Sequence, residues 1–279
     1  MLVNSKDILI QAKEGGYGVP APDFLDLDSA RVFVQTAQEV DKSIILSFAQ
    51  AHQEIISLEE AAAIGKLLAE SVTVPIALHL DHGQDLDFLK RAIDLGFTSV
   101  MIDASSKSFE ENVRITKEVV AMAHPRNVTV EAEIGHVGQG DTFGGGAEAD
   151  KSESVYTSVA EAVAFVEQTG VDSLAVSIGT SHGLYKNNGK PVLNFERLHE
   201  LAEAVEVPLV LHGSSGSGVE NIHRCATEGI AKINIFTDFL VGATQEIEAE
   251  KAIDYLAIKK ASNIGMAKVL RCNFDNFWK

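Results

Sequence analysis

The sequence predicts an α/β fold in the form of a single (β/α)8 TIM barrel. Apolar, strand-like runs alternate with amphipathic helical stretches along the whole chain, and eight such runs are each followed by a helical pattern. The composition shows no break that would mark a linker, and 279 residues is an ordinary length for one barrel. We therefore expect one domain over residues 1–279, with a C-terminal helical extension from about residue 238. An open doubly wound sheet is the alternative, although no glycine fingerprint follows the first expected strand.

The expected strands are short apolar runs that end in turn-forming or chemically reactive residues. The first run is weakened by two prolines, and the fifth is unusual because it holds two glutamates. The eight runs cover residues 18–22, 43–48, 75–83, 99–104, 127–134, 174–179, 207–211 and 231–235.

The expected helices begin at capping residues and several end at glycines. Ser57, with Glu60 three residues later, forms a capping-box signature, and Ser5 is the expected cap of the first helix. Residues 135–154 hold six glycines and little apolar content, so we interpret them as a mobile loop rather than a linker. The expected helices cover residues 5–14, 28–40, 57–71, 85–95, 108–123, 159–169, 194–204 and 219–228, and most of the chain after 238.

Net charge and cysteine content limit the kinds of partner and the cellular compartment that the sequence allows. A formal charge of -17 and a pI near 4.9 argue against nucleic acid or an anionic membrane as the partner, because both need a basic face. A phosphorylated substrate is still allowed, since local amides, a lysine or a metal can hold an anion. Cys225 and Cys272 are far apart and lack metal-ligand spacing, which favours a reducing cytoplasm. The N-terminus has no signal-peptide pattern, and no apolar run is long enough to span a bilayer.

Three of the nine histidines come directly before a glycine at or just after an expected strand end: His82, His182 and His212. In a parallel barrel the carboxyl ends of all strands meet on one face, so these side chains should converge. Three imidazoles around one axis suit a divalent cation such as zinc, with an open position for water or substrate. The alternative is that each is a hydrogen-bonded packing residue, but the repeated pairing with glycine favours a metal.

Acidic and amide side chains complete the same expected face. Asp81, next to His82, is a candidate general acid or base, or else a carboxylate that orients a histidine. Asp103 and Glu133 are candidates to orient ligands or to offer the metal a deeper position, and His79 should lie deeper in the barrel. The strand-end residues are Asp23, Ala49, Asp81, His82, Asp103, Glu133, His182, His212 and Asn234.

The loops after the last three strands are rich in glycine and hydroxyl residues. Such loops form the usual phosphate cradle of a (β/α) barrel, although tight turns favour the same residue types. A neighbouring metal site makes the phosphate interpretation the stronger of the two. The candidate residues are Gly183, Lys186, Gly213, Ser214, Ser215, Gly216 and Thr237.

These motifs, taken together, resemble the class II, zinc-dependent ketose-bisphosphate aldolases, which include fructose-1,6-bisphosphate and tagatose-1,6-bisphosphate aldolases. The likeness runs from about residue 5 to 240, with the motifs in the family's order and spacing. They are LHLDHG at 78–83, VEAE at 130–133, GTSHG at 179–183, LHGSSG at 211–216 and KIN at 232–234.

The resemblance implies reversible cleavage of a ketose bisphosphate to dihydroxyacetone phosphate and an aldehyde, a reaction of carbohydrate metabolism and glycolysis. Zinc, or another divalent cation, would polarise the ketone as a Lewis acid in place of a Schiff-base lysine. A monovalent cation and a homodimer or homotetramer are also implied.

The resemblance also assigns roles to single residues. It implies zinc on His82, His182 and His212, with Asp81 as the acid or base at the aldehyde-side oxygen. Asp103 with Glu133 would lie near a buried metal position, Glu133 would also be catalytic, and Asp141 is the nearest candidate for the acid on the glycine-rich loop. The substrate contacts would be Gly183, Lys186, Gly213, Ser215 and Thr237 at the phosphate, Asn234 at the enediolate, and Asp23.

Several departures from the family pattern concern the substrate more than the mechanism. Asp23 follows Pro22 where Phe-Asn is common, Ala49 stands where many members have a hydroxyl, and Phe236 is bulkier than usual. The C-terminus also differs, and Arg271 is the candidate for the arginine that some members lend from a neighbouring subunit to a second phosphate. The alternatives are therefore an aldolase for a different ketose phosphate, or a non-catalytic paralogue that binds a sugar phosphate. A metal-dependent hydrolase is disfavoured because residues 19–24 lack a His-x-His pair.

Overall fold

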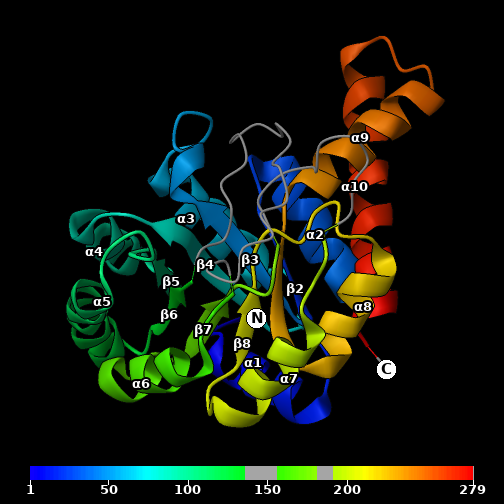
Figure 1. Cartoon of the computed structure of the whole chain (residues 1–279). Helices are drawn as coiled ribbons and strands as arrows, with labels where there is room; N and C mark the ends of the chain where they lie inside the picture. The colour runs from blue at the N-terminus through cyan, green and yellow to red at the C-terminus, as the bar shows by residue number, and fades with distance from the viewer. Residues whose placement is uncertain (136–155, 181–190, 279) are drawn as a thin grey trace.

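A parallel β-sheet curls around the interior of the molecule, and helices lie on its outside (Figure 1). The computed structural model describes residues 1–135, 156–180 and 191–278. The strands are β1 Leu2–Val3, β2 Val19–Pro22, β3 Ile44–Ala49, β4 Ile76–Gly83, β5 Ser99–Ile102, β6 Thr129–Ile134, β7 Ser173–Val176, β8 Leu209–Leu211 and β9 Ile230–Ile235.

Helices connect these strands throughout the described part of the chain. The α-helices are α1 Lys6–Gly15, α2 Leu27–Glu39, α3 Leu58–Glu70, α4 Leu86–Leu95, α5 Phe109–Ala123, α6 Val159–Thr169, α7 Phe195–Ala204, α8 Val219–Glu228, α9 Thr237–Ala249 and α10 Tyr255–Phe277. The described residues also form two short 3-10 helices, η1 Gln50–His52 and η2 His124–Arg126.

The strands pair in parallel in the order β3-β4-β5-β6-β7-β8-β9-β2, which confirms the predicted α/β class. The two ends of this series, β2 and β3, are joined by one parallel bridge between Asp23 and Ser47 and by the bond from Phe24 N to Ser47 O at 3.0 Å. The sheet is therefore strongly curled, but its last join is a single bridge rather than a full ladder. The short β1, which the sequence analysis did not expect, pairs with the start of β4.

Hydrophobic burial accounts for this arrangement. Nearly every strand residue is buried, because helices cover the outer face while side chains fill the interior, as parallel sheets require. The helices are amphipathic and bury one stripe each; α4, for example, buries Phe88, Leu89, Ala92 and Ile93. Because the strands are parallel, their carboxyl ends share one end of the curled sheet.

The helix caps and strand ends predicted from the sequence agree only in part with the structure. Ser57 and Glu60 form the predicted capping box at the start of α3. Ser5 makes no capping bond; its hydroxyl lies 3.1 Å from Ser99 Oγ and 2.6 Å from Thr129 Oγ1 instead. The sixth expected strand is shorter than predicted, since β7 ends at Val176. The predicted mobile loop at 135–154 lies, apart from Gly135, outside the described residues.

The C-terminal part forms two helices, α9 and α10, which pack closely on each other at the right of Figure 1. Their contact depends on glycine: a Cβ on Gly265 would lie 2.7 Å from the carbonyl carbon of Gly242. Trp278, the residue after α10, stacks its ring on that of Tyr17 with centroids 4.7 Å apart. None of the helices in the described ranges combines the length and hydropathy that a membrane span needs.

Candidate active site

The end of β4 brings Asp81 and His82 to the same site although they are adjacent in sequence. In a regular strand their side chains would point to opposite faces. The pairing of β4 with β5 shifts register between Leu80 and Gly83, and His82 has a positive φ of 47°. A positive φ is uncommon for a residue other than glycine and is often found at functional sites. This irregularity turns both side chains into the interior.

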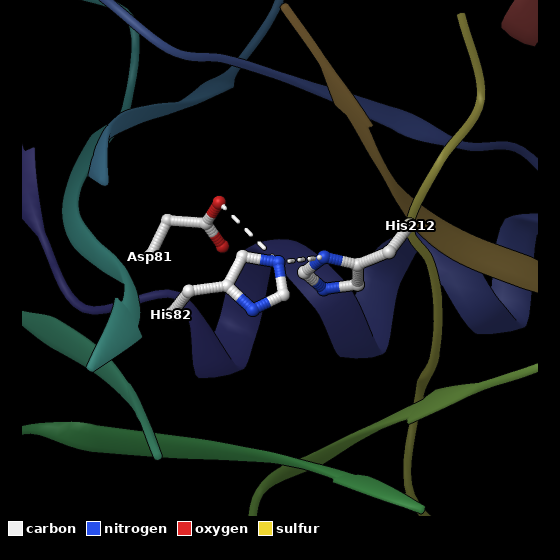
Figure 2. Close-up of side chains that lie close together, drawn as sticks. All are labelled: Asp81, His82 and His212. Atoms are coloured by element: carbon white, nitrogen blue, oxygen red, sulfur yellow. Dashed lines mark hydrogen bonds and ion pairs between the residues drawn. The ribbon is translucent and has the colours of Figure 1, made fainter. Parts of the chain in front are cut away.

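His82 and His212 face each other across the end of the sheet (Figure 2). Their near nitrogens, His82 Nε2 and His212 Nδ1, lie 2.9 Å apart. The far nitrogens each meet a carboxylate: His82 Nδ1 lies 3.0 Å from Asp103 Oδ2, and His212 Nε2 lies 3.0 Å from Glu131 Oε1. Since each ring donates its far N–H to a carboxylate, the near nitrogen of the neutral ring carries a lone pair. In the metal-free protein a proton lies between these two nitrogens at 2.9 Å, and a cation that replaced this proton would meet a lone pair on each ring.

Asp81 lies beside this pair and is held by Asn234. Asn234 Nδ2 donates to Asp81 Oδ1 at 2.9 Å, and Asp81 Oδ2 lies 4.0 Å from His82 Nε2. Asn234 Oδ1 is buried without a hydrogen-bond partner in the described part of the chain, so it is free to accept from a bound molecule. The arrangement leaves Asp81 fixed in place next to the imidazoles.

The carboxylates give the site a strongly negative field. Although burial opposes it, the charge of Asp81, the hydrogen bond to Asp103 and the charge of Glu133 raise the pKa of His82 to about 10. Burial and the neighbouring carboxylates Asp103, Asp81 and Glu131 outweigh His82 and raise the pKa of Glu133 to about 8. The shift of His82 reports an excess of negative charge, which a bound cation would offset, whereas the shift of Glu133 comes first from its burial.

The donor atoms fit a metal ion. Among the described residues, three groups have ligand atoms within 4.8 Å of one another: Asp81 with His82 and His212; His82 with Asp103 and Glu133; and His79 with Asp81 and Glu131. Imidazole with carboxylate is a donor set that zinc accepts. A buried Glu133 oxygen, Oε2, has no partner in the described ranges, which suits the deeper position expected from the sequence. The residues present therefore fit a divalent cation.

The loop after β8 lies beside the start of α9. Gly213 and Gly216, which flank Ser214 and Ser215, have positive φ values of 64° and 77°. Glycine adopts this backbone conformation at no steric cost, so the pair allows the tight turn of this loop. Ser215 Oγ accepts from the backbone N–H of Asp238 at 3.4 Å, and Thr237 is the first residue of α9. A helix N-terminus next to a glycine- and serine-rich loop is a common anion site. The structure thus brings Ser215, two residues after Gly213, to the start of α9, where Thr237 lies.

Four of the sequence-predicted site residues fall outside the described residues. They are Asp141, His182, Gly183 and Lys186.

Comparison with known proteins identifies the family. The family model described as "Fructose-bisphosphate aldolase class-II" matches residues 3–278. The chain belongs to this family. It is accordingly a class II aldolase, a lyase that breaks a carbon–carbon bond.

Relatives of this class II aldolase carry different substrate names. The chain is 38% identical over 251 residues to a fructose-bisphosphate aldolase of Staphylococcus epidermidis, covering 88% of this chain and 85% of the relative. It is 37% identical over 247 residues to the D-tagatose-1,6-bisphosphate aldolase subunit GatY of Klebsiella oxytoca, with the same coverage. It is 38% identical over 290 residues to a 6-phospho-5-dehydro-2-deoxy-D-gluconate aldolase of Halalkalibacterium halodurans, covering 99% and 96%.

A solved structure agrees with the fold. The YdjI aldolase of Escherichia coli K12 superimposes with a TM-score of 0.88 at 32% identity, covering 99% of this chain and 97% of the other. The relatives thus agree on aldol chemistry and differ in the named substrate.

Several residues of this aldolase site were not singled out from the sequence. Glu131 and Lys232 lie in the interior beneath the imidazoles, each two positions before a predicted site residue on the same strand. That period of two was the available signal, since alternate residues of a strand share a face. His52 is 4% exposed and packs on Phe236 with ring centroids 4.5 Å apart. Its burial involves contact between η1 and Phe236, which is far along the chain, so no local pattern shows it.

Ala49 and Asp23, which the sequence analysis marked as departures from the family pattern, lie next to Asp81. Ala49 is the strand partner of Asp81 in the β3–β4 ladder. Asp23 follows β2 and is buried, and burial followed by the charge of Asp81 raises its pKa well above the usual range. The two positions that the resemblance marked as departures therefore both lie beside Asp81.

Proposed function

We propose that this class II aldolase reversibly cleaves a ketose bisphosphate, by default fructose-1,6-bisphosphate or tagatose-1,6-bisphosphate, to dihydroxyacetone phosphate and an aldehyde, on a (β/α)8 barrel. The observation that carries the proposal is the opposition of His82 Nε2 and His212 Nδ1 at 2.9 Å, beside Asp81. His182 is proposed as the third metal-binding residue from the sequence alone. A bound zinc ion would act as a Lewis acid on the substrate ketone.

Asp81 is the proposed proton acceptor in the cleavage direction. As the bond between C3 and C4 of the ketose breaks, the C4 hydroxyl loses its proton to the Asp81 carboxylate and becomes the aldehyde. The bonding electron pair stays on C3, which later takes a proton from an acid, for which Glu133 and Asp141 are the candidates. Asn234 supports this role because its amide holds Asp81 Oδ1 and leaves its own Oδ1 for a substrate hydroxyl.

The proposed phosphate site is the loop after β8 with the start of α9. Gly213, Ser215 and Thr237 would offer backbone and hydroxyl groups to the phosphate of dihydroxyacetone phosphate, with Gly183 and Lys186 added from the sequence. A monovalent cation, a homodimer or homotetramer, and a cytoplasmic location belong to the same proposal as family-based expectations.

A second candidate is an aldolase for a different ketose phosphate. It is favoured by the buried acid Asp23 and the missing hydroxyl at Ala49, which both lie next to Asp81. The relative named for a deoxygluconate phosphate shows that similar chains carry other substrate names.

The test is a panel of ketose phosphates offered to zinc-loaded protein, with dihydroxyacetone phosphate detected as product in the presence and absence of a chelator. Chelator-sensitive release from fructose or tagatose bisphosphate is the expected result. Release from another member only would favour the second candidate. No release from any member, in protein that still binds zinc, would leave a sugar-phosphate-binding role instead.

A further inference from the structure

A buried ion pair crosses the interior of the curled sheet below the histidines. Lys232 Nζ on β9 lies 2.8 Å and 3.0 Å from the two carboxylate oxygens of Glu131 on β6, and each side chain is 1% exposed. Two strands, β7 and β8, separate β6 from β9 in the sheet, so the pair spans the interior. A buried ion pair rarely stabilises a fold more than apolar residues of the same size would. Its presence here calls for a role beyond stability.

Glu131 contacts His212 directly. His212 Nε2 lies 3.0 Å from Glu131 Oε1, the same oxygen that accepts from Lys232 at 3.0 Å. An ionised carboxylate only accepts hydrogen bonds, so this contact places the His212 proton on Nε2. The other nitrogen, Nδ1, is then unprotonated in the neutral ring, and it is the one that faces His82. The carboxylate therefore selects the tautomer that presents a lone pair to the proposed metal.

Lys232 is itself fixed from the far side. Its Nζ lies 3.2 Å from His79 Nε2, and His79 Nδ1 lies 2.8 Å from Ser99 Oγ. Since the ammonium group can only donate, His79 accepts at Nε2 and donates at Nδ1. The ammonium thus has hydrogen-bond acceptors in both Glu131 and His79. This network holds the Glu131 carboxylate in one orientation, with Oε1 shared between Lys232 and His212.

We infer that Lys232 and Glu131 are positioning residues that hold His212 in the tautomer with Nδ1 directed at the metal. The inference rests on the proposed function, because it concerns the same metal site. It predicts that the pair acts on metal affinity and metal geometry, beyond any effect on folding. A pair that served only to fill the interior would affect folding alone.

The test compares wild type with Glu131→Gln, Lys232→Met and the double variant Glu131→Met/Lys232→Met. Glu131→Gln keeps an oxygen that can accept from His212, so it serves as the conservative variant. Lys232→Met leaves a buried carboxylate without its cation and should destabilise the fold. The double variant removes both charges with side chains of similar length, so its stability should recover towards wild type.

Two readouts report the metal site without turnover. The first is zinc affinity of the metal-stripped protein, by titration against a competing chelator; the second is the visible absorption spectrum of the cobalt-loaded protein. We expect the double variant to unfold like wild type but to bind zinc roughly 10–100-fold more weakly, with an altered cobalt spectrum. Glu131→Gln should fall between wild type and the double variant. Thr169→Val is the matched control, because it removes a buried hydroxyl bonded to Phe165 O at 2.7 Å on α6.

Wild-type affinity and spectrum in a folded double variant would overturn the inference while leaving the proposed function intact. If wild type itself bound no zinc, the proposed function and the inference would both fall. If the double variant did not fold, histidine 15N NMR of zinc-loaded wild type would decide the matter. Zinc on His212 Nδ1 with a proton on Nε2 supports the inference, and the reverse assignment overturns it.

Discussion

His82 Nε2 and His212 Nδ1 lie 2.9 Å apart, while the far nitrogen of each ring meets its own carboxylate, Asp103 or Glu131. Two neutral rings held in this way turn lone pairs toward each other, an arrangement that is stable only when a proton or a metal ion lies between them. The positions of Asp103 and Glu131 thus determine which nitrogen of each imidazole can bind a cation.

Removing either imidazole should abolish tight metal binding. We expect His82→Ala and His212→Ala to lose more zinc affinity than the roughly 10–100-fold typical of outer partners of a metal site, and to lose turnover in parallel. Elemental analysis after dialysis and the dihydroxyacetone phosphate assay measure both. His199→Ala is the control, because its side chain is 56% exposed and pairs with Glu228 on the surface. Full zinc content and turnover in either variant would refute the metal site.

Asp81→Asn should lower turnover without removing the metal. The asparagine keeps an oxygen that can accept from Asn234 Nδ2, but it cannot take up the substrate proton. We expect kcat to fall by roughly 10²–10⁴-fold, the usual contribution of a general acid or base. Zinc stoichiometry measured on the same sample separates two roles: loss of zinc would make Asp81 a metal ligand rather than the proton acceptor.

Asp23→Asn should stabilise the metal-free protein near neutral pH. Asp23 Oδ1 is buried without a partner in the described ranges, and burial with the charge of Asp81 raises the pKa of this carboxyl well above its usual range. The folded state therefore keeps a proton that the unfolded chain releases above about pH 4, and the free energy of unfolding falls as the pH rises towards the folded-state pKa.

Asparagine has no such proton, so the variant should gain about 1–3 kcal/mol at pH 7 and lose less stability between pH 4 and pH 8. Urea unfolding of chelator-treated protein across this range provides the measurement. Identical pH slopes for the variant and wild type would show that Asp23 is not the responsible group.

Gly265→Ala should destabilise the protein, against the usual preference of helices for alanine. An added Cβ would lie 2.7 Å from the carbonyl carbon of Gly242 and 2.9 Å from Ala243 Cα, and this backbone cannot yield as a side chain could. We expect a loss of about 1–3 kcal/mol, typical of overpacking, in thermal or urea unfolding. Ser262→Ala on the same helix is the control and should be neutral or slightly stabilising. A stabilised Gly265→Ala would mean that α9 and α10 do not pack as described.

The two cysteines should differ in reactivity. Cys225 is buried, and burial with the charge of Glu228 raises the pKa of its thiol to about 12, whereas Cys272 is exposed. Because the thiolate is the reactive form, native protein at pH 8 should react with a thiol reagent at one site per chain and unfolded protein at two. Fast reaction at Cys225, located by mass spectrometry after digestion, would contradict its burial.

Most helices and strands of this protein could be predicted from the sequence. Alternation of apolar runs with amphipathic stretches predicted every strand except β1, because hydrophobic periodicity and capping are properties of a few neighbouring residues. The strand-end rule also grouped Asp81, His82 and His212, which the structure brings together, since parallel strands share the orientation of their carboxyl ends.

Other features of the site depend on residues far apart in the chain, and only the tertiary structure decided them. The register shift that turns both Asp81 and His82 inward arises from the pairing of β4 with β5. The tautomer of His212 depends on Glu131 and, through it, on Lys232 from a strand on the far side of the interior. Partners, burial and charge of an interior side chain are set by packing across the whole sheet, so the sequence determined which residues reach the site, and the fold determined what each of them can do there.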